Sequence, residues 1–179
     1  MSDEAHEPVK RLFFALSCPA EQRRAIAQWR GELALRIGRP VPTENFHLTL
    51  LFLGAVNVAQ IADIYAAAGE VRVPGMALTV ALDRLDVWRR PGVLVLAPEQ
   101  APPELLRLVH ALEQAMLPFG LEETGKEFRP HLTLLREFRA PAPESATPPE
   151  FFLHADRFAL FESHKGRYRV LAEWPLVAQ

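Results

Sequence analysis

A pentapeptide, His-Leu-Thr-Leu-Leu, occurs twice in the chain, at residues 47–51 and again at residues 131–135. Each copy alternates polar and apolar side chains, which is the period of a β-strand that buries one face. The imidazole and the hydroxyl of each copy therefore share the polar face of a strand, while the alternate leucines face a core. We expect the two polar faces to meet across one cleft. The candidate functional residues are His47, Thr49, His131 and Thr133.

The remaining periodicity favours a mixed fold with more strands than helices. Helices are predicted at about residues 19–37, 58–71 and 102–117, where apolar residues recur at helical spacing. Several predicted strands follow one another along the chain, so we expect them to pair antiparallel. The sequence therefore predicts the α+β class rather than a doubly wound parallel sheet. The other predicted strands are residues 11–16, 76–87, 93–96, 151–161 and 168–177.

Length and repetition together predict the domain organisation. A chain of 179 residues is long enough for one large domain or for two small lobes that share a core. Each copy of the pentapeptide would form the centre of one lobe. We therefore expect a single domain over residues 1–179, built of two pseudo-symmetric lobes.

The composition limits the cellular compartment and the kinds of binding partner that we expect for this protein. The only cysteine is Cys18, so we expect no intrachain disulfide and no cysteine-based metal cluster. No apolar run is long enough to cross a membrane, and no signal peptide precedes the first apolar stretch, so we expect a cytoplasmic protein. The formal net charge is −2, so a polyanionic partner would have to be held by a local patch. Since no apolar stripe is left unassigned, we expect a monomer.

Two histidines across a cleft can divide acid and base work, because the unperturbed pKa of histidine is about 6.5. The neutral imidazole can take a proton from water, and the protonated one can give a proton to a leaving oxygen. Threonine hydroxyls can donate hydrogen bonds to anionic oxygens, such as those of a phosphate. The set fits displacement at phosphorus without a metal ion or cofactor. Each motif offers only one good metal ligand, so a metal site is the poorer interpretation.

A single histidine in a strand is more often structural than catalytic, and the two copies could be edge positions of a symmetric scaffold. Their matching strand contexts favour function over that alternative.

At these motifs the chain resembles the 2H phosphoesterase superfamily, which is named for two such His-x-Thr motifs. Within it the chain resembles the RNA 2′,3′-cyclic phosphodiesterase family, also described as 2′–5′ RNA ligases (LigT-like). The likeness extends over nearly the whole chain. It includes residues 11–16, 38–42, 45–50 and 52–54, then 128–134 with Arg136, and Ser163 and Tyr168 near the end.

The resemblance implies a two-lobed α+β fold, with antiparallel sheets and flanking helices around a central groove. It implies hydrolysis of an RNA 2′,3′-cyclic phosphate end to a 2′-phosphomonoester, without metal or cofactor, and the reverse 2′–5′ ligation by the same chemistry. By position, His47 would be the proton donor to the 3′-oxygen and His131 the proton acceptor from water. Thr49 and Thr133 would hold the non-bridging oxygens. Which histidine is acid and which is base rests on the resemblance alone, because the two motifs are identical.

Two further residues are candidates for substrate binding. Arg136 follows the second motif and could pair with the phosphate. Strict alternation places it on the face opposite His131, so it contributes only if the strand ends or bulges there. Phe14 could stack on the terminal base. A core role for Phe14 is an equal alternative, because Leu12, Phe14 and Leu16 would share one face.

Two other functions stay open at this point. One is the same chemistry on a small molecule, such as a nucleotide cyclic phosphate or an ADP-ribose derivative. The other is an RNA-end binding module that does no chemistry. Two titratable residues argue against the second alternative, since binding alone does not need them.

Overall fold

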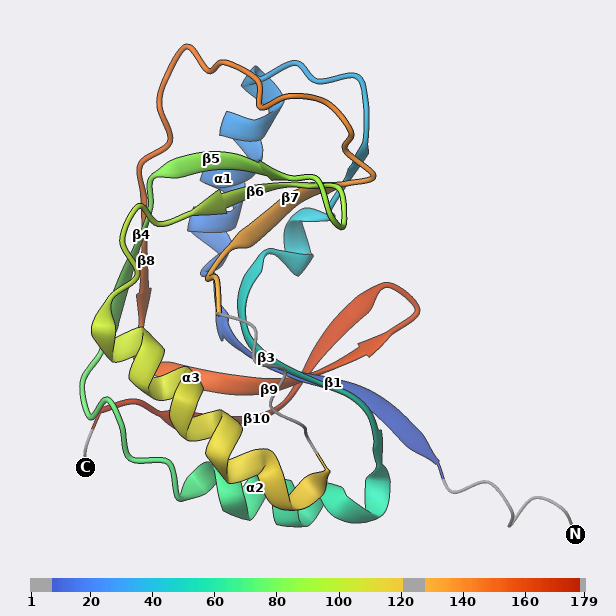
Figure 1. The fold of residues 1–179 in the computed structure, drawn as a ribbon, viewed down its shortest axis with the longest axis vertical. Helices are drawn as coiled ribbons and strands as arrows, with labels where there is room; N and C mark the ends of the chain where they lie inside the picture. The colour runs from blue at the N-terminus through green and yellow to red at the C-terminus, as the bar shows by residue number, and fades with distance from the viewer. Residues whose placement is uncertain (1–7, 121–127, 178–179) are drawn as a thin grey trace, which may run out of the picture.

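The computed structural model describes residues 8–120 and 128–177. Two four-stranded antiparallel sheets lie one above the other in Figure 1. We call β10-β9-β1-β3 the lower sheet and β2-β7-β6-β5 the upper sheet, and the pair β4-β8 joins them at one side. The strands are β1 (Val9–Ser17), β2 (Arg39–Pro40), β3 (His47–Asn57), β4 (Leu78–Leu82), β5 (Arg84–Trp88), β6 (Val93–Ala97), β7 (Leu132–Arg136), β8 (Phe151–Ala155), β9 (Arg157–His164) and β10 (Arg167–Pro175). The helices are α1 (Ala20–Glu32), α2 (Ile61–Gly69) and α3 (Pro103–Met116), with 3₁₀ turns at Thr43–Asn45, Val58–Gln60 and Leu117–Phe119.

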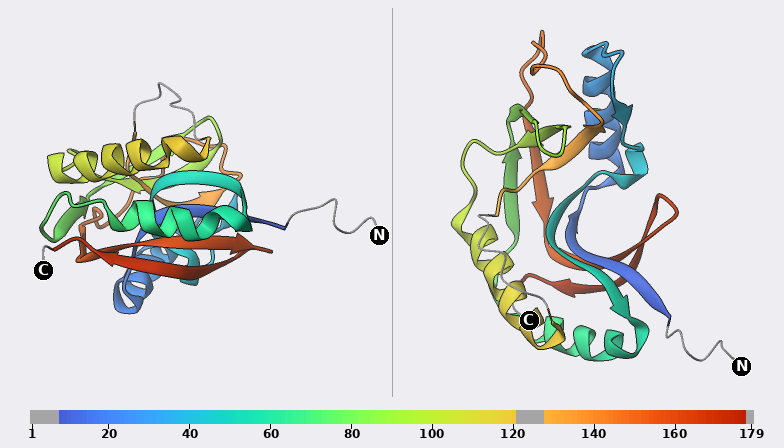
Figure 2. Two further views of the ribbon diagram at one scale, coloured as in Figure 1. Left: turned by 90° about the horizontal axis from the view of Figure 1, so that it is seen from below. Right: turned by 45° about the vertical axis from the view of Figure 1, so that its right-hand side comes forward.

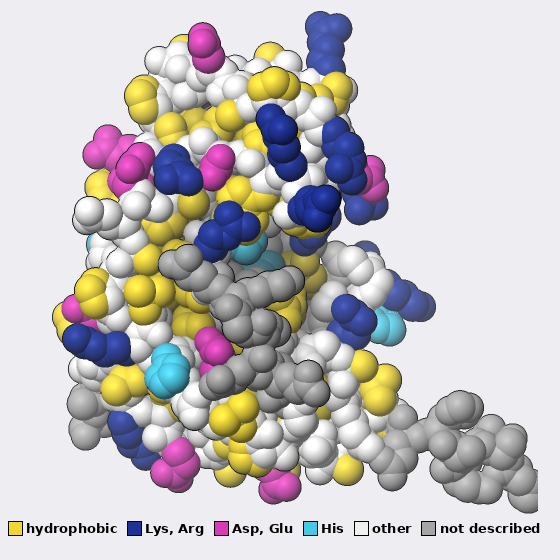
Figure 3. Space-filling model, viewed as in Figure 1, with side chains coloured by type: hydrophobic (Ala, Val, Ile, Leu, Met, Phe, Trp, Pro, Cys, Tyr) yellow, Lys and Arg dark blue, Asp and Glu magenta, His cyan; other side chains and the backbone are white. Residues whose placement is uncertain are grey.

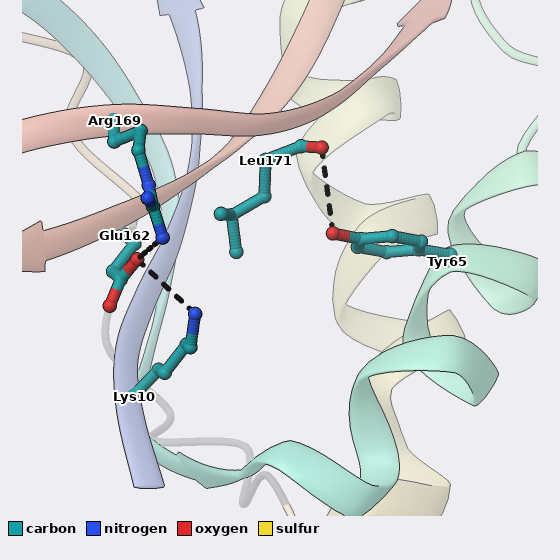
Figure 4. Close-up of polar contacts among 5 residues, drawn as sticks. All are labelled: Lys10, Tyr65, Glu162, Arg169 and Leu171. Carbon is teal, nitrogen blue, oxygen red and sulfur yellow. Dashed lines mark hydrogen bonds and ion pairs between the residues drawn. The ribbon is translucent and has the colours of Figure 1, made fainter.

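The helices cover the outer sides of the sheets and leave the space between them open. α1 follows a strand of the lower sheet but packs on the upper part, whereas α2 and α3 lie together beneath the lower sheet (Figure 2). Tyr65 of α2 donates a hydrogen bond of 3.5 Å to the carbonyl of Leu171 in β10 (Figure 4). Nearby, the carboxylate of Glu162 pairs with Arg169 at 2.6 Å and with Lys10 at 3.5 Å. The first contact joins α2 to the lower sheet, and the two ion pairs tie β9 to its neighbours β10 and β1.

Alternation along β1 divides its side chains between two environments. Leu12, Phe14 and Leu16 are almost wholly buried in the main core. Phe13 and Ala15 point to the other face of the strand, where they form a small second cluster with residues of β9. The lower sheet is therefore apolar on both faces, and its second face forms the floor of the space between the sheets.

Two of the predicted strands are interrupted, contrary to the sequence prediction. The segment predicted as one strand over 76–87 is split at Asp83, and that over 151–161 is split at Asp156. Asp83 accepts a hydrogen bond from the backbone of Glu99, and the Asp156 carbonyl accepts one from the backbone of Leu176. Aspartate is disfavoured in strands, and here each one ends a strand of the β4–β8 pair. The chain passes from that pair into a different sheet at each break.

A β-bulge occupies the same position in both copies of the pentapeptide. In the β1–β3 pair, Thr49 is opposite Ala15 and Leu51 is opposite Phe14, which leaves Leu50 without a partner. In the β6–β7 pair the same step skips Leu134. A bulge inserts one residue and resets the alternation of the strand. As a result, the fifth residue after each histidine returns to the histidine's face. These fifth residues are Phe52 and Arg136.

The bulge in β7 is fixed by a side chain from α1. Arg30 donates hydrogen bonds of 2.8 Å to the carbonyls of Val41 and Leu134. We predict that Arg30→Met lowers the free energy of unfolding by about 2 kcal/mol, because it leaves two inward carbonyls without a charged donor. Denaturant unfolding would measure the loss. Arg24→Met, at an exposed position of the same helix, is the matched control, and an equal loss in both variants would contradict this role for Arg30.

Candidate active site

A cavity of about 250 Å³ lies between the two sheets and gathers most of the candidate residues. Histidine side chains are visible in the hollow between the upper and lower parts of the molecule in Figure 3. The first motif reaches the cavity from β3, and the second reaches it from the start of β7. The sequence prediction that both polar faces share one cleft therefore agrees with the structure. The lining consists of Val41, Asn45, His47, Thr49, Phe52, Trp88, Pro91, Val93, His131, Thr133, Arg136 and Tyr168.

In each candidate catalytic histidine, the ring is oriented by the backbone carbonyl of the residue two positions earlier. Nδ1 of His47 lies 2.6 Å from the carbonyl oxygen of Asn45, and Nδ1 of His131 lies 2.9 Å from that of Arg129. A carbonyl oxygen can only accept a hydrogen bond, so Nδ1 must carry the proton in both rings. Nε2 is then the atom of each ring that can take or give a proton.

Thr49 is hydrogen-bonded to the first histidine. Its Oγ1 lies 2.7 Å from Nε2 of His47. When His47 is neutral, Nε2 has a lone pair and the Thr49 hydroxyl donates to it. When Nε2 is protonated, the hydroxyl hydrogen is free to turn toward another acceptor. The protonation state of the imidazole therefore controls where the hydroxyl donates.

Aromatic rings surround His47. Its ring centroid lies 4.9 Å from that of Phe13 and 5.1 Å from that of Tyr168, which meets it edge-on. This burial lowers the pKa of His47 to about 4, and the charge of nearby Arg136 acts in the same direction. In the free protein at neutral pH, His47 is therefore an uncharged imidazole.

His131 has different neighbours. Its ring lies 4.3 Å from the ring of Trp88, and the Arg129 guanidinium lies 4.0 Å above the same indole. Burial lowers the pKa of His131, and the positive charges of Arg129 and Arg136 lower it further. Arg129 thus acts on His131 through its backbone carbonyl, its charge and its packing on Trp88.

The two predicted substrate-binding residues differ in outcome. Arg136 lines the cavity with its side chain exposed, because the bulge at Leu134 returns it to the face of His131. Phe14 has no exposed surface and packs against Phe158 and Trp174, with ring centroids 6.0 Å away in each case. A buried ring cannot stack on a base, so the stacking prediction for Phe14 is wrong and its core alternative is correct.

Comparison with known proteins gives one consistent result. A family model described as LigT like Phosphoesterase matches the chain twice, over residues 16–95 and 95–172. The chain belongs to the LigT-like phosphoesterase family.

Individual relatives in this family match two thirds or more of the chain. The RNA 2′,3′-cyclic phosphodiesterase of Escherichia coli (strain K12) is 37% identical over 93% of this chain and 97% of its own length. That of Bacillus subtilis (strain 168) is 31% identical over 67% of this chain and 69% of its own length. The crystal structure of E. coli LigT complexed with 3′-AMP superposes with a TM-score of 0.84 at 34% identity, covering 96% of this chain and 100% of that chain.

These comparisons confirm the family, the LigT-like α+β fold and the assignment to hydrolytic enzymes. The non-catalytic alternative is accordingly disfavoured. No helix within residues 8–120 and 128–177 is long and apolar enough to span a membrane. Over the same residues, no three His, Cys, Asp or Glu side chains come together so that they could hold a metal ion.

Several residues of this phosphoesterase site were missed by sequence reasoning. The alternation that buries Phe14 also turns Phe13 toward His47. The aromatic residue of β1 that reaches the site is therefore Phe13, the residue before the one predicted. Trp88 ends β5, far from either motif in sequence, and no local pattern distinguishes it from a core aromatic. The histidine-orienting carbonyls of Asn45 and Arg129 carry no side-chain signal, although their equal spacing from the two histidines is visible.

The lowered pKa of His47 predicts how stability depends on pH. Between pH 6.5 and about 4 the unfolded chain binds a proton at His47 more readily than the folded protein, so acidification destabilises the fold. We predict that the parent loses about 2 kcal/mol more between pH 7 and pH 5 than His47→Asn, which cannot titrate. Urea unfolding at the two pH values would measure this difference. His110→Asn, at an exposed position of α3, should behave like the parent, and parallel curves for His47→Asn would refute the prediction.

Proposed function

We propose that this phosphoesterase hydrolyses the 2′,3′-cyclic phosphate at an RNA end to a 2′-phosphomonoester, without a metal ion. One observation carries the proposal. Both imidazoles line the same cavity, and each has its Nδ1 tied to a carbonyl, which leaves Nε2 for proton transfer. The names of the curated relatives, which are RNA 2′,3′-cyclic phosphodiesterases, support the choice of substrate.

The proposed roles follow the resemblance described above. A water oxygen attacks phosphorus while Nε2 of His131 takes its proton. The bond from phosphorus to the 3′-oxygen breaks, and Nε2 of His47 gives its proton to that oxygen. The product has a 2′-phosphate and a free 3′-hydroxyl. With a 5′-hydroxyl in place of water, the same displacement forms a 2′–5′ linkage, and each imidazole keeps its role. In the reverse of that ligation the 3′-hydroxyl attacks phosphorus and the 5′-oxygen leaves, so the imidazoles exchange roles.

Three side chains are proposed to hold the phosphate. Protonation of His47 at Nε2 releases the Thr49 hydroxyl, which can then donate to a non-bridging oxygen. Thr133 occupies the corresponding position of the second motif. Arg136 is the charged group of the cavity lining, and its guanidinium suits a phosphate oxygen pair.

The free site has both imidazoles neutral, whereas the reaction needs one of them protonated. An anionic phosphodiester in the cavity favours the imidazolium form and so raises both pKa values. Substrate binding and protonation of the acid are therefore coupled in the proposed mechanism. The monomeric state and the cytoplasmic location expected from the sequence stay predictions.

The histidine roles are tested on a short RNA with a 2′,3′-cyclic phosphate end, assayed in EDTA. We predict that His47→Ala and His131→Ala each lower kcat by roughly 10²–10⁴-fold, because each loses one positioned proton-transfer group. The parent should give a 2′-phosphate at an unchanged rate in EDTA. His154→Ala, which changes an exposed residue of β8, is the control. A 3′-phosphate product would show that the 2′-oxygen leaves, and inhibition by EDTA would overturn the metal-free mechanism.

The charge of Arg136 should set the position of the pH profile. This charge lowers the pKa of both His47 and His131. We predict that Arg136→Gln moves both limbs of the pH profile of kcat/KM to higher pH, whatever it does to the maximum. Arg107→Gln on α3 should leave the profile where it is. If Arg136→Gln lowers the maximum of kcat/KM but leaves both limbs of the pH profile in place, Arg136 contributes to substrate binding and does not set the pKa values of the histidines.

A further inference from the structure

A second hollow adjoins the cavity on the upper sheet. It has a volume of about 520 Å³ and lies between the β5–β6 hairpin and the segment that follows β7. We call it the arginine groove. Its lining consists of Asp86, Val87, Arg89, Phe138, Arg139, Ala140, Pro141 and Ala142.

The groove and the cavity share a wall. Trp88 lines the cavity and its neighbour Arg89 lines the groove. On the other side, Arg136 lines the cavity and Phe138, two residues later, lines the groove. The backbone N–H of Phe138 donates a hydrogen bond of 3.0 Å to the carbonyl of Gly92 at the hairpin turn. The same two segments, β5 with its hairpin turn and β7 with the residues after it, thus contribute to both hollows.

The charges in the groove are available for an anion. Arg89 and Arg139 are exposed, and neither has an ion pair or a hydrogen bond with any residue that the structure describes. Asp86, the acidic residue of the lining, is already paired with Arg84 at 2.8 Å and accepts a backbone hydrogen bond from Val87. Figure 3 shows Lys and Arg side chains gathered over the upper half of the face that contains the hollow.

One of these arginines packs against the hairpin turn. The guanidinium carbon of Arg139 lies so close to Gly92 that a Cβ added there would be 3.2 Å from it. Gly92 has a φ of +90° and no side chain, so the turn leaves room for the planar guanidinium. Packing of this kind reduces the conformational freedom that the arginine would lose on binding.

We propose that the arginine groove is a subsite for the penultimate phosphodiester of the RNA, contacted by Arg89 and Arg139. This inference rests on the proposed function. An RNA that ends in a 2′,3′-cyclic phosphate carries its next phosphate on the 5′-oxygen of the terminal nucleoside. A free nucleoside 2′,3′-cyclic phosphate lacks that group. The subsite would therefore make the enzyme prefer an RNA end over a small cyclic phosphate, which is the alternative that the sequence left open.

The test compares two substrates, adenosine 2′,3′-cyclic phosphate and the dinucleotide ApA with a 2′,3′-cyclic phosphate end. We expect Arg139→Ala and Arg89→Ala each to lower kcat/KM for the dinucleotide about tenfold, because a charge-assisted phosphate contact is lost. The kcat/KM for adenosine 2′,3′-cyclic phosphate should not change in either variant. This unchanged value also shows that the variants are folded. The slope of log kcat/KM against log salt for the dinucleotide should become shallower by about 0.7.

Two control variants define the alternatives. Arg107→Ala changes an exposed arginine of α3 and should affect neither substrate. Arg167→Ala changes an exposed arginine beside the β9–β10 turn. This variant tests the alternative that the RNA leaves the cavity along that turn instead of through the arginine groove. A loss in Arg167→Ala with none in Arg139→Ala, or equal losses on both substrates, would overturn the subsite. If the parent turns over neither substrate, the proposed function itself fails and the subsite falls with it.

Discussion

The site depends on one irregularity that the two motif strands share, the unpaired leucine at the fourth position of each pentapeptide. A regular strand would turn the fifth residue after each histidine into the core. The bulge instead places Phe52 and Arg136 beside the imidazoles, where they line the cavity. At β7 the carbonyl of the bulged Leu134 accepts hydrogen bonds from Arg30 of α1 and from the backbone of Val41, so a helix on the outer surface contacts a feature of the cleft. The geometry of the cavity is thus a property of strand pairing as much as of the motifs.

The two motifs share the bulge and the carbonyl contact, and the division of one domain into two pseudo-symmetric lobes stays a prediction. The family model also matches the chain twice. What differs between the two motifs is the surroundings of each imidazole. His47 packs against the rings of Phe13 and Tyr168, whereas His131 packs against Trp88 and feels the charges of two arginines. Identical motifs can take opposite roles only through such differences.

Sequence reasoning found the four motif residues because their signal is local. A strand period of two residues, repeated in two places, is sufficient to place His47, Thr49, His131 and Thr133 on polar faces. The same rule failed where the period itself changes. It could not place Arg136, because a bulge is decided by the partner strand. It also joined β4 to β5 across Asp83, because each of the two segments alternates like a strand. The error over Phe14 has the same origin, since adjacent phenylalanines of one strand face opposite environments and only the tertiary packing shows which face is covered.

The surroundings that bury His47 also oppose the charge that an acid must carry. An isolated imidazolium among aromatic rings is costly, and this cost lowers its pKa in the free protein. A phosphodiester anion in the cavity supplies the missing counter-charge, so the proton is held most firmly when the substrate is present. The overall charge of −2 is compatible with such a site, because the cations that matter are local. Arg136 lies in the cavity and Arg89 and Arg139 in the adjoining groove, while the acidic residue beside them is already paired. A protein that recognises one end of an RNA needs positive charge along a short path, and a uniformly basic surface would add affinity for every other RNA without adding selectivity for that end.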